Sequence, residues 1–359
     1  MKKLFLSLLF VFLCPSFVWA SPQVDQIMAD MSDEEKAAQL ILVYYTNAEF
    51  IVDNEFGGVL IMQNMLKDPD KLKAGLQEMQ SSSKRGVLVS IDQEGGRVNR
   101  MKLLPEWGKV PSAKEMSTWS DVRITEFAME VAEPLNGLGI NLNLAPVLDP
   151  GLDYLGEKTF MAKKQRSFGS DSNQISLKAG AYIKGFQQYN IASVSKHFPG
   201  YDVQTNSDHE VAISQASFEN VRKNIQPFQK LASEVNGVMV SSIHYEKFSE
   251  APAVMSKKMV GLARKTNPDA ILMTDDLWGK ALRSWVEEKG NTTNNQQVLA
   301  LTRSALDAGN DMLMITFPEK AVLMKEAIVD WMKEDENFRK RVNDSVYRIL
   351  QNKEKMGLI

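Results

Sequence analysis

Residues 194–209, VSKHFPGYDVQTNSDH, are the stretch from which the rest of this sequence is best interpreted. The apolar run that leads into it, residues 192–194, is typical of a buried strand and ends abruptly in Lys196 and His197. A Pro-Gly stop and a polar loop that ends in His209 follow. Parallel α/β barrels build their sites in this way, with polar side chains at the carboxyl end of a strand and in the loop after it.

Seven further apolar runs resemble strands, and most of the eight are continuous rather than alternating, as expected for parallel strands covered on both faces. The predicted strands are Leu40–Tyr45, Gly57–Met62, Gly86–Asp92, Ile140–Ala145, Ala192–Lys196, Gly237–His244, Ala270–Asp275 and Asp311–Thr316. Helical patterns separate most of them, at Asp70–Gln80, Val122–Leu135, Glu219–Ser233, Asn295–Ala308 and Glu319–Glu334, and a terminal helix is predicted at Glu336–Met356.

This alternation predicts an α/β fold: a single (β/α)8 TIM-type barrel with some irregular strands and an added C-terminal helix. A doubly wound open sheet is the alternative. The sequence shows no glycine-rich dinucleotide turn, because Gly57-Gly58 begins a strand and Gly95-Gly96 lacks the spacing. No linker or short-period repeat divides the chain, so one domain is the better interpretation.

The N-terminus is typical of a signal peptide. Two lysines precede the apolar run Leu4–Leu13, which is short for a membrane span, and Val18–Ala20 suits a cleavage site. We therefore predict a signal peptide at residues 1–20, a catalytic barrel domain at 21–359, no stable membrane anchor, and a periplasmic or secreted protein. The single cysteine, Cys14, lies within the predicted signal, so the mature chain would have no disulfide or catalytic thiolate.

The 42 basic and 45 acidic residues nearly balance, and no basic stripe indicates nucleic-acid binding. The three histidines, His197, His209 and His244, do not form a cluster with metal-ligand spacing. We expect no metal and no other cofactor, and we expect a monomer.

Polar residues gather where the predicted strands end, which is where a barrel places its chemistry. These residues are Gln63, Asn64, Asp92, Asp149, Lys196, His197, His244, Asp275 and Asp276. Lys196 and His197 can form a hydrogen-bonding floor for a sugar or a phosphate, or Lys196 can form a structural ion pair with a neighbouring acid such as Asp92.

Asp92 opens the segment DQEGGRVNRM, in which the glycine pair permits a tight turn. This turn can bring Asp92, Glu94, Arg97 and Arg100 into one small volume, where Asp92 can accept two hydroxyl hydrogen bonds from a ligand. A solvated turn with a local ion pair is the structural alternative.

Asp275 follows a run that should be fully buried, so its carboxylate must be either paired or functional. Asp276 comes next, and consecutive strand residues point to opposite sides, so one of the two should face the barrel mouth. An ionised carboxylate there can act as a nucleophile or stabilise an oxocarbenium-like state. The alternative is a carboxylate that caps the next helix.

Seven colinear segments resemble glycoside hydrolase family 3, most closely its single-domain β-N-acetylglucosaminidase (β-hexosaminidase) branch. They cover most of residues 35–320 and read GGVLIM, VSIDQEGGRVNRM, INLNLAPVLDP, QRSFGSD, KHFPG with its downstream loop, ILMTDDL and ALDAGNDMLMI. The resemblance implies a retaining exo-glycosidase with Asp275 as the nucleophile and His209 as the acid/base. It also implies a set of sugar-binding residues, namely Asp92, Arg100, Arg166, Lys196 and His197.

The loop departs from the branch, in which an Asp two residues before the His assists it. Ser207 stands at that position here and the acid is at Asp208, while Tyr201-Asp202 replaces the usual His-Gly. We expect Asp208 to support His209, with Asp202 or Glu210 as alternatives. Trp278-Gly279 likewise replaces the usual Ser-Met after the nucleophile segment.

The favoured hypothesis is removal of terminal β-linked N-acetylglucosamine from peptidoglycan fragments or chitin oligosaccharides. A non-catalytic or weakly active sugar-binding barrel is the alternative, motivated by the altered loop. A phosphate-binding isomerase or aldolase barrel is a more distant hypothesis, since residues 277–281 and 317–321 do not supply the glycine-rich loop that it needs.

Overall fold

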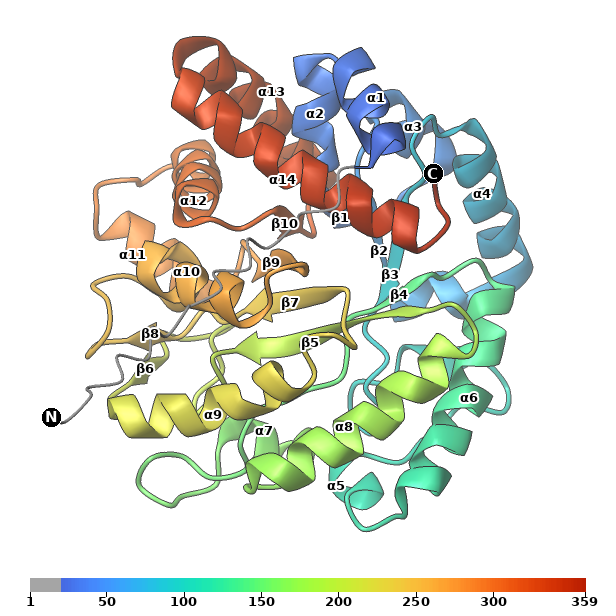
Figure 1. Ribbon diagram of the computed structural model, residues 1–359, viewed down its shortest axis with the longest axis vertical. Coiled ribbons are helices and arrows are strands. Elements are labelled where there is room, and N and C mark those ends of the chain that lie inside the picture. Colours follow the sequence, from blue (N-terminus) through green and yellow to red (C-terminus); the bar gives the residue numbers. More distant parts are fainter. Residues whose placement is uncertain (1–20) are drawn as a thin grey trace, which may run out of the picture.

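The computed structural model describes residues 21–359, so the predicted signal peptide lies outside the described residues. Eight parallel strands close into a ring with helices around it (Figure 1). The strands, in ring order, are β1 (Ile41–Tyr44), β10 (Met312–Ile315), β9 (Ile271–Asp276), β7 (Gly237–Val240), β5 (Ala192–Phe198), β4 (Leu142–Asn143), β3 (Leu88–Ile91) and β2 (Gly58–Ile61). The predicted (β/α)8 barrel is confirmed.

Helices connect the strands and cover the outside of the ring. The α-helices are α1 (Pro22–Asp30), α2 (Asp33–Gln39), α3 (Ala48–Asn54), α4 (Pro69–Ser82), α5 (Ala113–Met116), α6 (Asp121–Gly137), α7 (Phe160–Lys163), α8 (Ser172–Gln187), α9 (Phe218–Lys230), α10 (Lys257–Thr266), α11 (Lys280–Glu287), α12 (Asn294–Ala308), α13 (Pro318–Glu334) and α14 (Glu336–Lys355). Short 3-10 turns lie at η1 (Gln63–Lys67), η2 (Arg100–Leu103) and η3 (Ala253–Met255). No helix in residues 21–359 is long and apolar enough to cross a bilayer.

Each predicted strand overlaps one barrel strand, and the predicted irregularity is present. Strand β4 has only two residues, and the register shifts between β5 and β7 and between β10 and β9. The largest boundary error is in the predicted strand 237–244, which ends at Val240. His244 instead lies in β8 (His244–Tyr245), which pairs with β6 (Ile213–Ser214) in a separate two-stranded sheet.

Alternate strand residues fill the inside of the ring, as the two-residue period of a strand requires. This interior cluster is apolar and comprises Leu42, Leu60, Leu88, Leu142, Leu144, Ala192, Val194, Met239, Ile271, Met273, Met312, Met314 and Ile349. Because Ile271 and Met273 face inward, Asp275 does too, two residues further along β9. The same two-residue alternation along β5 directs Lys196 inward, because Val194 faces inward two residues before it. The packing of the core therefore determines which polar side chains reach the mouth.

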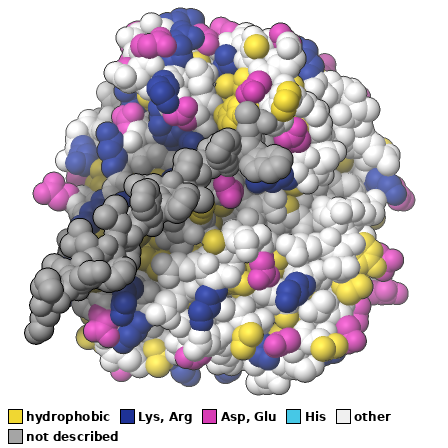
Figure 2. All heavy atoms as spheres, in the orientation of Figure 1, with side chains coloured by type: hydrophobic (Ala, Val, Ile, Leu, Met, Phe, Trp, Pro, Cys, Tyr) yellow, Lys and Arg dark blue, Asp and Glu magenta, His cyan; other side chains and the backbone are white. Residues whose placement is uncertain are grey.

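Helix α14 crosses the opposite, amino-terminal end of the strands (Figure 1). Its Ile349, with Met356 and Leu358 just beyond it, packs against the interior cluster. Figure 2 shows this face, where charged side chains of both signs are interspersed with small hydrophobic groups. This end of the barrel is therefore covered by the chain's own helix.

Candidate active site

A cavity of about 210 Å³ lies at the carboxyl ends of the strands. Charged and polar side chains from several strand ends and loops line it, as expected for a barrel of this kind. The lining residues are Asp92, Glu94, Val98, Arg100, Met161, Arg166, Lys196, His197, Tyr201, Asn206, Ser207, Asp208, Met239 and Asp275. The cavity thus brings together seven of the eight residues selected from the sequence and omits His209.

The turn after Asp92 depends on its two glycines. Gly95 and Gly96 have φ angles of 92° and 54°, which favour glycine. A Cβ atom on Gly95 would lie 2.3 Å from the carbonyl oxygen of Pro111. The turn directs Glu94 into the cavity beside Asp92, whereas Arg97 is exposed and does not line it, contrary to the expected convergence.

Five charged side chains form a network on one wall of the cavity. Lys196 Nζ lies 2.6 Å from Asp92 Oδ1 and 2.7 Å from Glu94 Oε1. Arg100 Nη2 lies 3.1 Å from Asp92 Oδ2. Arg166 makes a two-pronged contact with Glu94, with its Nε and Nη2 at 2.7 and 2.8 Å from the two carboxylate oxygens. The expected Lys196–Asp92 ion pair is therefore present, within a larger network.

The network holds its acids ionised. Burial alone would raise the pKa of Asp92, but the charges of Lys196 and Arg100 outweigh it and lower that pKa. Burial likewise opposes ionisation of Glu94, and the charges of Arg166 and Lys196 together lower its pKa to about 2. Because these carboxylates cannot readily act as proton donors near neutral pH, this wall is suited to binding hydroxyl groups.

His197 is held by the buried carboxylate of Asp149, which the sequence placed at a strand end without assigning it a role. Asp149 Oδ2 lies 2.6 Å from His197 Nδ1, and Asp149 Oδ1 accepts hydrogen bonds from the backbone N–H groups of His197 and Tyr201 at 2.9 and 2.7 Å. Asp149 is fully buried and occupies Nδ1, so His197 Nε2 is the ring nitrogen left for a ligand.

Unlike Asp92 and Glu94, Asp275 forms no ion pair with a cation within residues 21–359. Its Oδ1 accepts a hydrogen bond from the backbone N–H of Asp276 at 2.8 Å. Burial, followed by the nearby charge of Asp208, raises the pKa of Asp275 to about 6. Asp276 faces outward, where its carboxylate accepts hydrogen bonds from Thr316 Oγ1 and the backbone N–H of Trp278.

The loop after β5 places Asp208 in the cavity lining, although this residue is exposed to solvent. His209 is also exposed and lies outside the cavity lining. No hydrogen bond or ion pair in the described part of the chain joins the His209 ring to a carboxylate. The expected support of His209 by Asp208 is therefore not seen, and neither alternative acid contacts the ring. Asp202 is buried beside Asn224, and burial raises its pKa to about 7, whereas Glu210 is exposed.

Sequence reasoning missed the parts played by Glu94, Asp149 and Tyr201. Two signals were available: Glu94 lies in the same turn as Asp92, and Asp149 follows a predicted strand end. His244, singled out at a predicted strand end, does not line the cavity, and its Nε2 lies 2.7 Å from the Ser249 carbonyl oxygen.

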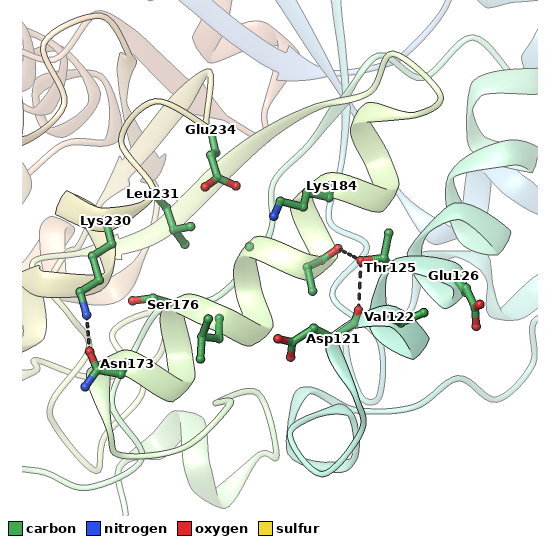
Figure 3. Close-up of a pocket in the computed structure, with 13 residues that line it drawn as sticks. Asp121, Val122, Thr125, Glu126, Asn173, Ser176, Lys184, Lys230, Leu231 and Glu234 are labelled. Carbon is green, nitrogen blue, oxygen red and sulfur yellow. Dashed lines mark hydrogen bonds between the residues drawn. The ribbon is translucent and has the colours of Figure 1, made fainter.

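A larger cavity, about 600 Å³, lies on the outside of the barrel between α6, α8 and α9 (Figure 3). Its polar groups largely form hydrogen bonds with neighbouring protein groups. Thr125 Oγ1 donates to backbone carbonyl oxygens on α6 and α8, and Lys230 bonds Asn173. The titratable side chains on its walls do not converge on a common point in Figure 3, so the smaller cavity is the better catalytic candidate.

Comparison with known proteins agrees with this assignment. Residues 32–352 match the model of the glycosyl hydrolase family 3 N-terminal domain. The chain belongs to glycosyl hydrolase family 3. As a member of this family, it is a glycosidase.

Individual family 3 relatives cover most of the chain. The β-hexosaminidase LpqI of Mycobacterium tuberculosis is 30% identical over 274 residues, 71% of this chain and 68% of that protein. A β-hexosaminidase of Hydrogenovibrio crunogenus is 27% identical over 277 residues, 74% of this chain and 73% of that protein. The solved structure of M. tuberculosis LpqI aligns with a TM-score of 0.77 at 25% identity, covering 91% of this chain and 95% of that one. A β-N-acetylhexosaminidase structure from Beutenbergia cavernae has a TM-score of 0.76 at 24% identity, covering 91% and 99%.

The family 3 site contains the components of a double displacement at an anomeric carbon. One wall offers hydrogen-bonding groups held in fixed ionisation states, and the opposite side offers a carboxyl group without a counter-ion. Within residues 21–359 no group of three His, Cys, Asp or Glu side chains is arranged to hold a metal ion.

Proposed function

We propose that this glycosidase removes terminal β-linked N-acetylglucosamine with retention of configuration, through a covalent ester on Asp275. The observation that carries the proposal is the position of Asp275, which lacks an ion-pair partner and shares a small cavity with Lys196 and Asp92. A volume of about 210 Å³ is below the roughly 300 Å³ at which pockets for drug-sized molecules begin. It suits one sugar ring, as an exo-acting enzyme requires.

The proposal assigns the binding of sugar hydroxyl groups to Asp92, Arg100, Arg166, Lys196 and His197. Preference for the 2-acetamido sugar is supported by the names of the relatives, which are β-hexosaminidases. Peptidoglycan fragments and chitin oligosaccharides are the proposed sources of that sugar. The N-terminal pattern of residues 1–20 supports export, so we place the protein in the periplasm or outside the cell, acting as a monomer.

The test compares 4-nitrophenyl N-acetyl-β-glucosaminide with the matching glucoside. We expect nitrophenol release from the first and at least about 10-fold lower kcat/KM for the second, because a missing polar substituent leaves buried polar groups unpaired. A 5-fluoro glycosyl fluoride of N-acetylglucosamine should then trap the intermediate, and mass spectrometry should find one added sugar on the peptide that contains Asp275. No release from either substrate, or a label on a different residue, would contradict the proposal.

A non-catalytic sugar-binding barrel is the competing function. It predicts that calorimetry detects binding of N-acetylglucosamine to the wild-type protein while neither nitrophenyl substrate is cleaved. The unpaired carboxyl group of Asp275 argues against it, since a binding site gains nothing from a buried carboxylate whose ionisation is opposed.

A further inference from the structure

The loop after β5 is fixed at its start by Tyr201, which replaces the family's usual histidine. Its backbone N–H donates to Asp149, and its buried hydroxyl accepts from the Ser207 backbone N–H at 2.7 Å and donates to the Thr205 carbonyl oxygen at 2.9 Å. The Tyr201 side chain therefore holds the far part of the loop close to its own position.

The same loop is fixed a second time by the segment that follows the nucleophile. Lys280 N–H donates to the Asp208 carbonyl oxygen at 3.1 Å, and Ala281 N–H donates to the Ser207 carbonyl oxygen at 3.0 Å. These are first-turn N–H groups of α11, whose N-cap, Gly279, provides no side-chain cap. The loop supplies the missing acceptors, which fixes Asp208 on the wall of the cavity that contains Asp275.

His209 cannot share that position. The backbone N–H groups of His209 and Glu210 both donate to the Asn206 carbonyl oxygen at 3.0 Å, which is the pattern of one helical turn. Successive side chains in such a turn point about 100° apart. With Asp208 on the cavity wall, His209 is turned out to solvent.

We propose that Asp208, and not His209, is the acid/base of the reaction, with Tyr201 as a positioning residue. This inference rests on the proposed function. Asp275 attacks the anomeric carbon, the bond from that carbon to the glycosidic oxygen breaks, and the oxygen takes the proton of the Asp208 carboxyl group. Water then gives a proton to the Asp208 carboxylate while its oxygen attacks the same carbon, which releases the sugar and the Asp275 carboxylate.

The electrostatic coupling of the two groups is consistent with this division of labour. The charge of Asp208 contributes, after burial, to the raised pKa of Asp275, so the two carboxyl groups influence each other's ionisation. Formation of the ester removes the negative charge on Asp275. The cavity therefore no longer holds two neighbouring carboxylate charges when Asp208 acts as the base in the second step.

The experiment measures the leaving-group dependence of Asp208→Ala, His209→Ala and Tyr201→Phe, with Glu210→Ala as an exposed control. With N,N′-diacetylchitobiose, a poor leaving-group substrate, Asp208→Ala should lose about 10²–10⁴-fold in kcat/KM. With the 2,4-dinitrophenyl glycoside, which needs little protonation, the loss should stay below roughly 10-fold. Azide should restore turnover of Asp208→Ala on that substrate and yield the β-glycosyl azide.

His209→Ala and Glu210→Ala should stay within about 3-fold of wild type on both substrates, as expected for exposed residues outside the chemistry. Tyr201→Phe should lose less kcat than Asp208→Ala, with the larger loss on the poor leaving-group substrate and little change in KM. A loss of folding would not produce this dependence on the leaving group. Leaving-group dependence and azide rescue in His209→Ala but not in Asp208→Ala would overturn this inference and leave the proposed function intact. Absence of sugar release by the wild-type protein from either substrate would remove both.

Discussion

At the amino-terminal end of the barrel, the buried Asp311 is surrounded by donors, whereas at the carboxyl end Asp275 has one backbone hydrogen bond. Asp311 accepts from Arg264, from Arg348 Nε at 2.9 Å and from Ser345 Oγ at 2.8 Å. These charges outweigh the effect of burial and lower the pKa of Asp311. At Asp275, burial prevails and raises the pKa.

The two carboxylates have the same chemical nature, and although Asp311 is fully buried and Asp275 only partly, they differ most in what the neighbouring elements contribute. Helix α14 and α10 place arginines against Asp311, and that end needs no ligand to satisfy its charges. At the mouth, cations pair with Asp92 and Glu94 but not with Asp275. An unpaired carboxylate with a raised pKa is unfavourable in itself, so it persists only because the rest of the fold holds it in place. Each of the following predictions tests one side of this comparison.

Asp275→Asn should have the largest effect, a loss of about 10⁴-fold or more in kcat on 4-nitrophenyl N-acetyl-β-glucosaminide, because the nucleophile is removed. Asp276→Asn is the matched control, since Asp276 faces outward and Asn keeps an acceptor for the Trp278 N–H. Steady-state kinetics of both variants checks the prediction. Equal losses in the two variants would contradict the assignment of Asp275 to the mouth chemistry.

The same variant should stabilise the fold near neutral pH. The folded-state pKa of Asp275, about 6, is above its usual value of 3.8, so the folded protein binds the proton more tightly and wild-type stability falls as pH rises from 4 to 6. Asp275→Asn lacks this loss and should be more stable at pH 7 by on the order of 2 kcal/mol. Urea unfolding at pH 4 and pH 7 measures the difference, which should disappear at the lower pH.

Lys196→Met should cost about 3–5 kcal/mol in the free energy of unfolding, because Asp92 and Glu94 lose a shared buried cation. It should also lower kcat/KM, since the same side chain faces the cavity. Urea unfolding and kinetics on the folded fraction together measure both effects. A stable variant with unchanged kinetics would show that the network is dispensable.

Asp311→Asn should cost about 3 kcal/mol, because three arginines lose their common partner at a buried site. In contrast to Lys196→Met, the folded fraction should keep wild-type kcat and KM. Thermal unfolding with activity measured well below the midpoint checks this. A selective loss of kcat would show that the two ends of the barrel are coupled.

Lys353→Met tests the amino-terminal end of the barrel, which α14 covers, through the pH dependence of the free energy of unfolding. Burial, followed by the charge of Arg85, lowers the pKa of Lys353 to about 7, while its Nζ donates to Gln39 Oε1 and the Gly86 carbonyl oxygen. The unfolded chain holds the proton to higher pH, so wild-type stability should rise between pH 7 and 10 by about 1 kcal/mol per pH unit. The variant should show a flatter profile in urea unfolding, and an equally steep one would exclude Lys353 as the source.

The fold was predictable because buried parallel strands leave a local signal, namely continuous apolar runs that end in polar residues. The resemblance of seven segments to a family supplied the site residues on strands and tight turns, such as Asp92, Lys196 and Asp275. Which of Asp275 and Asp276 faces the mouth was not fixed by the pair alone, and it follows from the inward positions of Ile271 and Met273.

The orientation of the loop could not be predicted in the same way. The position of Asp208 depends on carbonyl oxygens bound by α11 and on the Tyr201 hydroxyl, with partners up to 74 residues apart. Backbone N–H and carbonyl groups are the same in almost every residue type. The residues present at positions 201–209 therefore did not reveal that these contacts exist. The prediction that His209 is the acid/base was therefore transferred from the family pattern by sequence position, and it competes with the role proposed for Asp208.

Asp149 connects two parts of the site that are usually considered separately. One carboxylate orients the His197 ring and also holds the backbone at Tyr201, where the loop begins. Insertions and deletions between Tyr201 and Ser207 would separate the Tyr201 hydroxyl from the Thr205 and Ser207 backbone groups that it holds. The length of this interval should therefore stay constant among relatives that keep Tyr201, and engineered changes in substrate range would best start outside it.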